Sequence, residues 1–280
     1  MPMMNIKKDT KIWYDLVGEG PLIVLNHGYG SSHLSLSYVA NFLKTDFKCL
    51  LWDQRGQGNS TKQLRSDYEE TRKIYTLQRI AEDCFNLIRG LGLLDENPGG
   101  IYMYGHSMGG MISQLYAIEH ELTLKGLALG STTAVPIKHE YAMLLEQLKQ
   151  GKIHLNEDFF AANAENGFTS AFVLKHPEYV EEVVADKIKV PEDVTIALLD
   201  NFLNNYQTSR NLVDLQIPVL IMHGKKDESI PFKCGKHLHN IIPNNRLIAF
   251  QEQKHEINKE IPEKVAHEIR SFFFNESSNK

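Results

Sequence analysis

Short, uninterrupted runs of apolar residues recur along this chain and alternate with segments of helical periodicity. A continuous apolar run predicts a strand covered on both faces, as in a parallel sheet between two helical layers. The expected strands are residues 21–26, 47–52, 101–104, 124–129, 217–222 and 246–250. Residues 11–16 are expected to add an antiparallel strand at the edge. The chain is therefore predicted to adopt an α/β fold, with a mostly parallel central sheet and helices on both faces.

One segment lacks any convincing strand pattern. Residues 131–212 show only helical patterns separated by turn signals, which predicts a helical cap or lid inserted between two strands. The expected division is an α/β core of residues 1–130 and 213–280, with residues 131–212 as the cap. Five aromatic residues of this segment either line an acyl-binding pocket or form the core of the cap itself: Phe159, Phe160, Phe168, Phe172 and Tyr206.

The strongest local motif is GHSMGG at residues 105–110, directly after one predicted strand and directly before a helical pattern. G-x-S-x-G in a strand–turn–helix context holds a serine on a sharp turn above the carboxyl edge of the sheet. The following helix begins with free backbone N–H groups, which favour a developing negative charge. Ser107 is thus the predicted nucleophile.

A serine nucleophile needs a base to take its proton and a carboxylate to orient that base. Asp227 and His255 each follow a later predicted strand, so they are expected at the same sheet edge as Ser107. The chain order serine, aspartate, histidine is the order typical of this kind of site. Glu228 is a weaker alternative for the acid.

Two other histidines lie near these positions, and neither is the expected base. His106 and His223 are predicted to pack or to form local hydrogen bonds. The glycine-rich residues 26–30 follow the first predicted parallel strand and can supply a second backbone donor for an oxyanion. The predicted oxyanion hole consists of the N–H groups of Tyr29 and Met108.

Taken together, these segments resemble the α/β-hydrolase superfamily over nearly the whole chain. The matching landmarks are residues 18–21, 27–28, 53–60, 105–110, 223–227 and 255. The sharp turn that carries Ser107, the nucleophile elbow, is similar to that of serine carboxylesterases, monoacylglycerol lipases and cofactor-free haloperoxidases. The serine argues against the dehalogenase and epoxide hydrolase branches, which use a carboxylate nucleophile. Gln57 replaces a histidine usual in residues 53–60, a segment expected to be structural through local hydrogen bonds of Asp53 and Arg55.

The resemblance implies an α/β-hydrolase fold with a helical cap and a serine hydrolase that cleaves a carboxylic ester. The expected substrate is a small or medium, partly apolar acyl compound, and no metal or organic cofactor is needed. Lactonase, thioesterase and C–C bond hydrolase activities require the same three residues and stay open. A ligand receptor or signalling protein that retains the three residues is a further alternative from a different functional class.

Composition sets the remaining expectations. A net charge of −5 argues against nucleic-acid binding, and no apolar stretch is long enough for a membrane helix. Three widely spaced cysteines and a start without a secretory pattern favour a cytoplasmic protein, as a monomer or homodimer. Cys234, His237 and His239 do not have the spacing of a metal site on one helix. Lys187 and Lys189, with the neighbouring Asp186, are expected to form a solvated face.

Overall fold

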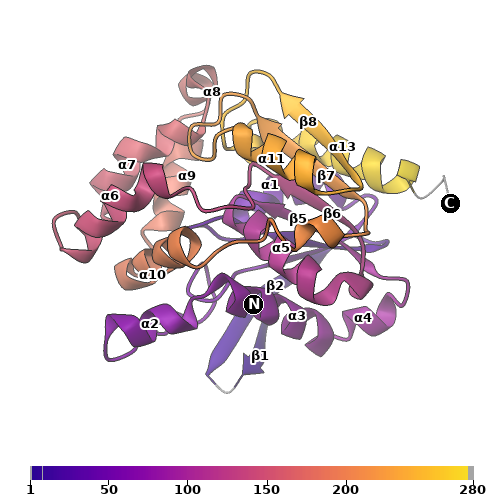
Figure 1. The fold of residues 1–280 in the computed structure, drawn as a ribbon, viewed down its shortest axis with the longest axis horizontal. Coiled ribbons are helices and arrows are strands. Elements are labelled where there is room, and N and C mark those ends of the chain that lie inside the picture. Colours follow the sequence, from indigo (N-terminus) through magenta and orange to yellow (C-terminus); the bar gives the residue numbers. More distant parts are fainter. Residues whose placement is uncertain (1, 8, 277–280) are drawn as a thin grey trace.

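The computed structural model describes residues 2–7 and 9–276 and contains an eight-stranded sheet between helical layers (Figure 1). The strands lie in the order β1-β2-β4-β3-β5-β6-β7-β8. Their bounds are β1 Met3–Lys7, β2 Thr10–Val17, β3 Leu22–Asn26, β4 Lys48–Trp52, β5 Ile101–His106, β6 Leu124–Gly130, β7 Val219–Gly224 and β8 Asn245–Phe250. The sheet is parallel from β4 to β8, whereas β2 pairs in antiparallel fashion with both β1 and β4. The predicted α/β-hydrolase fold is confirmed.

Strands β3, β5 and β7 are buried at every position, as their continuous apolar sequences predict. One face of the sheet is covered by α1 and α13, and the other by α3 and α5. The helices outside the β6–β7 connection are α1 Leu34–Leu43, α2 Tyr68–Ile74, α3 Leu77–Gly90, α4 Leu93–Glu96, α5 Met108–His120, α11 Lys233–Ile241, α12 Ile257–Glu260 and α13 Pro262–Glu276.

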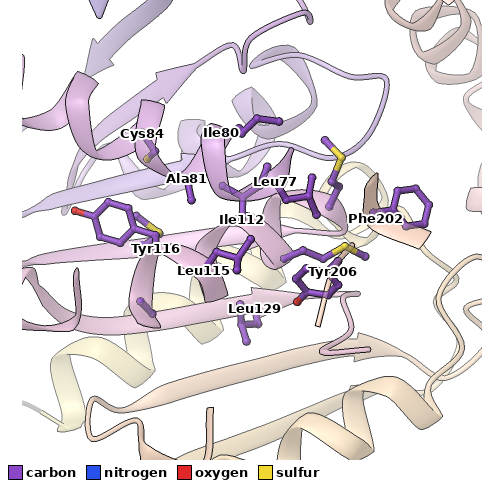
Figure 2. Packing of buried hydrophobic residues seen from close by; sticks show 14 of the residues in the cluster. Leu77, Ile80, Ala81, Cys84, Ile112, Leu115, Tyr116, Leu129, Phe202 and Tyr206 are labelled. Atoms are coloured by element: carbon purple, nitrogen blue, oxygen red, sulfur yellow. The ribbon is translucent and has the colours of Figure 1, made fainter. Parts of the chain in front are cut away.

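Helix α3 illustrates how the sequence pattern becomes packing. Thr76 caps its first turn by accepting a hydrogen bond from the backbone N–H of Arg79, and apolar residues then recur at helical spacing. Figure 2 shows Ile80 and Cys84 of α3 facing Ile112 and Tyr116 of α5 across the largest apolar cluster. This contact fixes α5, and with it the turn from which α5 starts.

The amino-terminal part of the sheet differs from the prediction in one respect. Strand β2 was expected at the edge, but β1 pairs with it on the outside. Strand β1 alternates exposed and partly exposed residues and carries no continuous apolar run. It therefore lacks the pattern that identifies the inner strands.

The turn after β4 is held by buried charges. The Asp53 carboxylate accepts hydrogen bonds from the backbone N–H groups of His33 and Asn59, both at 2.7 Å. A side chain at Gly58 would collide with that carboxylate, and the φ of Gly58 is +49°. Arg55 was expected to form local hydrogen bonds only. Its guanidinium instead also forms a two-pronged ion pair with the distant Asp83 of α3.

Between β6 and β7, where the backbone of every residue is described, the chain forms helices and turns but no strand. In Figure 1 these helices gather beside one end of the sheet. Their bounds are α6 Lys138–Lys149, α7 Glu157–Ala164, α8 Ser170–Lys175, α9 Glu178–Lys187 and α10 Glu192–Asn204.

Candidate active site

Ser107 lies at the turn between the end of β5 and the start of α5. Its φ of 56° and ψ of −124° are unusual for a residue with a side chain, as expected at a sharp strand-to-helix turn. A Cβ on Gly109 would lie 2.0 Å from the carbonyl oxygen of Asn26, so only glycine fits against β3. The carbonyl oxygen of Ser107 accepts a 2.7 Å hydrogen bond from the Thr132 hydroxyl. These contacts fix the direction of the Ser107 side chain.

The loop after β3 runs beside this serine. A Cβ on Gly28 would lie 3.3 Å from the Cβ of Ser107 and 3.8 Å from its hydroxyl oxygen. Tyr29 follows in the chain, and Met108 is the first residue of α5, whose N–H has no intrahelical partner. The two predicted oxyanion donors therefore belong to segments that flank Ser107.

Asp227 and His255 come from the loops after β7 and β8, and their side chains meet. The Asp227 Oδ2 atom lies 2.8 Å from His255 Nδ1. The other carboxylate oxygen accepts hydrogen bonds from the N–H groups of Ser229 and Ile230, both at 2.9 Å. Asp227 is thereby fixed in place, while the neighbouring Glu228 is exposed and pairs with Lys254 at 3.0 Å.

The charges of this pair reinforce each other. Burial would raise the pKa of Asp227, but His255 and His223 outweigh it and hold that pKa far below its ordinary value. Burial would lower the pKa of His255, but the charge and hydrogen bond of Asp227 outweigh it, and the pKa of His255 lies above 6.5. The aspartate is ionised at neutral pH and stabilises a proton on the imidazole.

His106 and His223 form contacts with the Asp227–His255 pair. His106 Nε2 lies 2.9 Å from the carbonyl oxygen of His255, a contact that requires the proton on Nε2. Burial, followed by the charge of His255, lowers the pKa of His106 to about 4, so its ring is neutral. His223 Nε2 lies 2.7 Å from the carbonyl oxygen of Ile230 and 3.3 Å from Asp227 Oδ2. His106 links the serine turn to the histidine loop.

A cavity of about 470 Å³ opens above these groups. Ser107, His255, Tyr29 and Met108 all line it. Much of the remaining wall is apolar. Residues 131–212 contribute Leu144, Leu155, Phe159, Phe160, Val183 and Phe202 to it. The cavity is large enough for a medium-sized acyl group.

Of the five predicted pocket aromatics, Phe159 and Phe160 line the cavity. The structure places the other three elsewhere. Phe168 is buried and stacks on Phe172, with ring centroids 5.5 Å apart. The Tyr206 hydroxyl donates toward Gln114 Oε1 at 2.9 Å and the Thr133 carbonyl oxygen at 2.8 Å. These three side chains pack within the protein instead of facing the cavity.

The expected solvated face around Lys187 is wrong in part. Lys189 is exposed, but Asp186 is buried, and its carboxylate accepts a 2.7 Å hydrogen bond from the Ser32 hydroxyl. Lys187 lines the cavity. The last turn of α9 packs against the loop after β3, so its charged residues face inward despite their polar sequence.

Cys234, His237 and His239 occupy α11, as predicted. The two histidines form hydrogen-bond contacts with polar side chains. His237 Nε2 lies 3.1 Å from the Ser209 hydroxyl, and His239 Nδ1 lies 2.7 Å from Asn245 Oδ1. Among residues 2–7 and 9–276, no group of three histidine, cysteine or acidic side chains is arranged to hold a metal ion. No helix in the same part of the chain is long and apolar enough to cross a bilayer.

A mostly parallel sheet with a serine at the strand–turn–helix elbow, beneath an apolar cavity, defines an α/β hydrolase. The chain belongs to the serine aminopeptidase S33 family, whose model matches residues 20–262. It is similar to a proline iminopeptidase of Lactobacillus delbrueckii subsp. bulgaricus, with 28% identity over 276 residues that cover 89% of this chain and 88% of the relative.

Two further similarities point to ester hydrolases. A pimeloyl-[acyl-carrier protein] methyl ester esterase of Vibrio atlanticus is 23% identical, covering 88% of this chain and 92% of the relative. The structure of a thermophilic esterase from Thermogutta terrifontis superposes with a TM-score of 0.83 at 22% identity, covering 95% of this chain and 94% of the other. The chain is a hydrolase of a small-molecule substrate, and carboxylic ester hydrolysis is consistent with its relatives.

Proposed function

We propose that the protein hydrolyses a carboxylic ester through an acyl-enzyme, with Ser107 as nucleophile, His255 as base and Asp227 as the orienting acid. One observation carries this proposal: the Asp227–His255 hydrogen bond of 2.8 Å lies beside the cavity that Ser107 also lines. A base held by a buried carboxylate at the same cavity as a serine on a strained turn is the arrangement that acyl transfer requires.

In the proposed reaction His255 takes the proton of the Ser107 hydroxyl, whose oxygen attacks the ester carbonyl. The N–H groups of Tyr29 and Met108 bind the oxyanion, a contribution of roughly 3–4 kcal/mol for each donor in comparable enzymes. His255 then returns the proton to the leaving alcohol. Water repeats the sequence on the acyl-enzyme and releases the acid, and Asp227 holds the imidazole throughout.

We further propose that residues 131–212 act as a cap that selects the substrate, over a core of residues 1–130 and 213–280. Support comes from the cavity wall, to which α6, α7, α9 and α10 all contribute residues. The apolar part of that wall fits a small or medium, partly apolar acyl group. The net charge of −5 and three free cysteines support cytoplasmic action without a nucleic-acid partner. The proposed oligomeric state is a monomer or homodimer.

Hydrolysis of p-nitrophenyl esters from acetate to decanoate tests the function. We expect kcat/KM to rise by up to about fourfold per added methylene until the cavity is filled, and then to fall. The control is Ser107→Ala under the same conditions. Equal rates for wild type and Ser107→Ala on every ester would refute the proposal.

The pH dependence of this hydrolysis is a second test. His255 acts as a base only when neutral, so kcat/KM is expected to fall as the pH drops through the raised pKa of His255, with a midpoint above 6.5. In Asp227→Asn the stabilising charge is gone and burial dominates, so the midpoint of the residual activity shifts down. Glu228→Gln is the matched control and keeps the midpoint. An unchanged midpoint in Asp227→Asn would contradict the assigned roles.

A second candidate is cleavage of an amino-terminal residue, in keeping with the name of the proline iminopeptidase relative. The cavity wall includes Glu228 and Glu256, and because Glu228 pairs with Lys254, Glu256 is the acidic side chain that suits a substrate amine. L-Proline p-nitroanilide, assayed beside the esters, distinguishes the two. Ser107-dependent turnover of the anilide with higher kcat/KM than any ester would favour the peptidase.

A further inference from the structure

Lys187 places a positive charge in the cavity close to the proposed oxyanion loop. Its ammonium lies 5.7 Å from the ring centroid of Tyr29 and 5.7 Å from that of Phe160. A Cβ on Gly30 would lie 3.7 Å from the same nitrogen. The side chain thus reaches from the end of α9 to the residue that follows Tyr29.

The two lysines that line the cavity differ in their partners. Lys259 forms an ion pair with Glu182, and its ammonium also lies over the rings of Tyr38 and Tyr179. Lys187 has no carboxylate within 4.0 Å among the described residues. Burial lowers the pKa of Lys187, in keeping with the lack of a paired carboxylate.

Two carboxylates, those of Asp186 and Glu256, lie near enough to Lys187 to act on it electrostatically, but neither forms an ion pair with it. Asp186 accepts the hydrogen bond of the Ser32 hydroxyl and lies 4.0 Å from Lys189. Glu256 lines the cavity beside His255 and raises the pKa of Lys187 through its charge, but not enough to offset burial. Lys187 is therefore a cavity cation that the protein itself leaves without a paired anion.

We propose that Lys187 binds an anionic group of the substrate, a carboxylate set apart from the scissile ester, so that the preferred substrate is an ester bearing a negative charge. This inference rests on the proposed function, because it specifies the substrate of the same site. A carboxylate that enters the cavity gains a charge-assisted hydrogen bond from the ammonium of Lys187. The aromatic faces of Tyr29 and Phe160 hold the ammonium in position while the cavity is empty.

Binding is measured first, independently of turnover, in the Ser107→Ala protein. Two matched pairs of esters place the charge on either side of the scissile bond. Mono-p-nitrophenyl adipate is compared with p-nitrophenyl hexanoate, and 4-carboxyphenyl hexanoate with its methyl ester. In at least one pair we expect the charged ester to bind about 10- to 100-fold more tightly in Ser107→Ala than in Ser107→Ala/Lys187→Met, relative to its neutral partner.

Turnover of the same pairs gives the second measurement. The ratio of kcat/KM for charged and neutral esters is expected to fall by about 10-fold or more in Lys187→Met and to recover partly in Lys187→Arg. Lys189→Met, which removes an exposed charge two residues away, is the matched control and leaves the ratio unchanged.

The outcomes separate this inference from the proposed function. Ser107-dependent hydrolysis with a ratio that Lys187→Met does not alter in either pair overturns the role of Lys187 and leaves the esterase in place. Lys187-dependent binding of a charged ester without any hydrolysis supports the anion site and overturns the esterase. An equal loss of the ratio in Lys189→Met would show a general charge effect and would also overturn the assignment to Lys187.

Discussion

Ser107→Ala or His255→Ala alone is expected to lower kcat by a factor on the order of 10⁶, and the double variant by hardly more. The reason is that the two groups act together. Without His255 no base takes the proton of the Ser107 hydroxyl, and without Ser107 the imidazole has no nucleophile to activate. Asp227→Ala is expected to lower kcat by a smaller factor, on the order of 10⁴ to 10⁵, because the imidazole is still present but is no longer held in position. Single-turnover and steady-state hydrolysis of one p-nitrophenyl ester measures all four proteins.

The control for this series is folding. Ser107→Ala removes one oxygen atom, so its urea-unfolding midpoint should match that of wild type. Losses that simply multiply in the double variant would contradict the joint action of Ser107 and His255. Retained activity in His255→Ala would move the role of base to another residue.

The largest expected effect on stability comes from Arg55→Met. The Arg55–Asp83 pair is buried, with side-chain exposures of 5% and 0%, and it connects the turn after β4 to α3. Burial raises the pKa of Asp83, and only Arg55 opposes this strongly. Removing the guanidinium leaves a buried carboxylate without its partner, which is expected to lower the free energy of unfolding by about 3–5 kcal/mol. Urea unfolding monitored by circular dichroism measures the change.

Two variants sharpen this test. Arg55→Met/Asp83→Leu replaces both charges by apolar groups and is expected to regain much of the lost stability. Lys7→Met breaks the exposed Lys7–Glu82 pair on the adjacent residue of α3, and should change stability by less than about 1 kcal/mol. A loss in Arg55→Met no larger than that in Lys7→Met would show that the buried pair contributes little.

The fold was predictable because most of its strands are covered on both faces. Such strands, β3 and β7 among them, must be apolar throughout, and that pattern is visible in a single sequence. The position of Ser107 was equally predictable from the sequence, since its turn requires glycine at fixed spacing. Asp227 and His255 followed from their positions at strand ends, and the structure brings their side chains within 2.8 Å.

The features that sequence reasoning did not find depend on contacts between distant segments. Lys187 and Asp186 look like a surface pair, and only the packing of α9 on the loop after β3 turns them inward. Phe168 and Tyr206 are as apolar or aromatic as Phe160, yet neighbours in space decide which of them faces the cavity. Arg55 offered no signal for Asp83, because nothing in the spacing of the two residues marks them as partners.

The neighbouring strands β6 and β7 are separated in the chain by all of residues 131–218. The entropy lost on closing a loop grows only slowly, by about 0.6 kcal/mol for each doubling of its length. In chain entropy alone, lengthening or shortening this connection therefore costs the sheet little. The same order of strands delays assembly during synthesis, because β7 and β8 leave the ribosome after everything else in the sheet. Chain growth thus brings the loops that carry Asp227 and His255, the proposed acid and base, to the turn of Ser107 last.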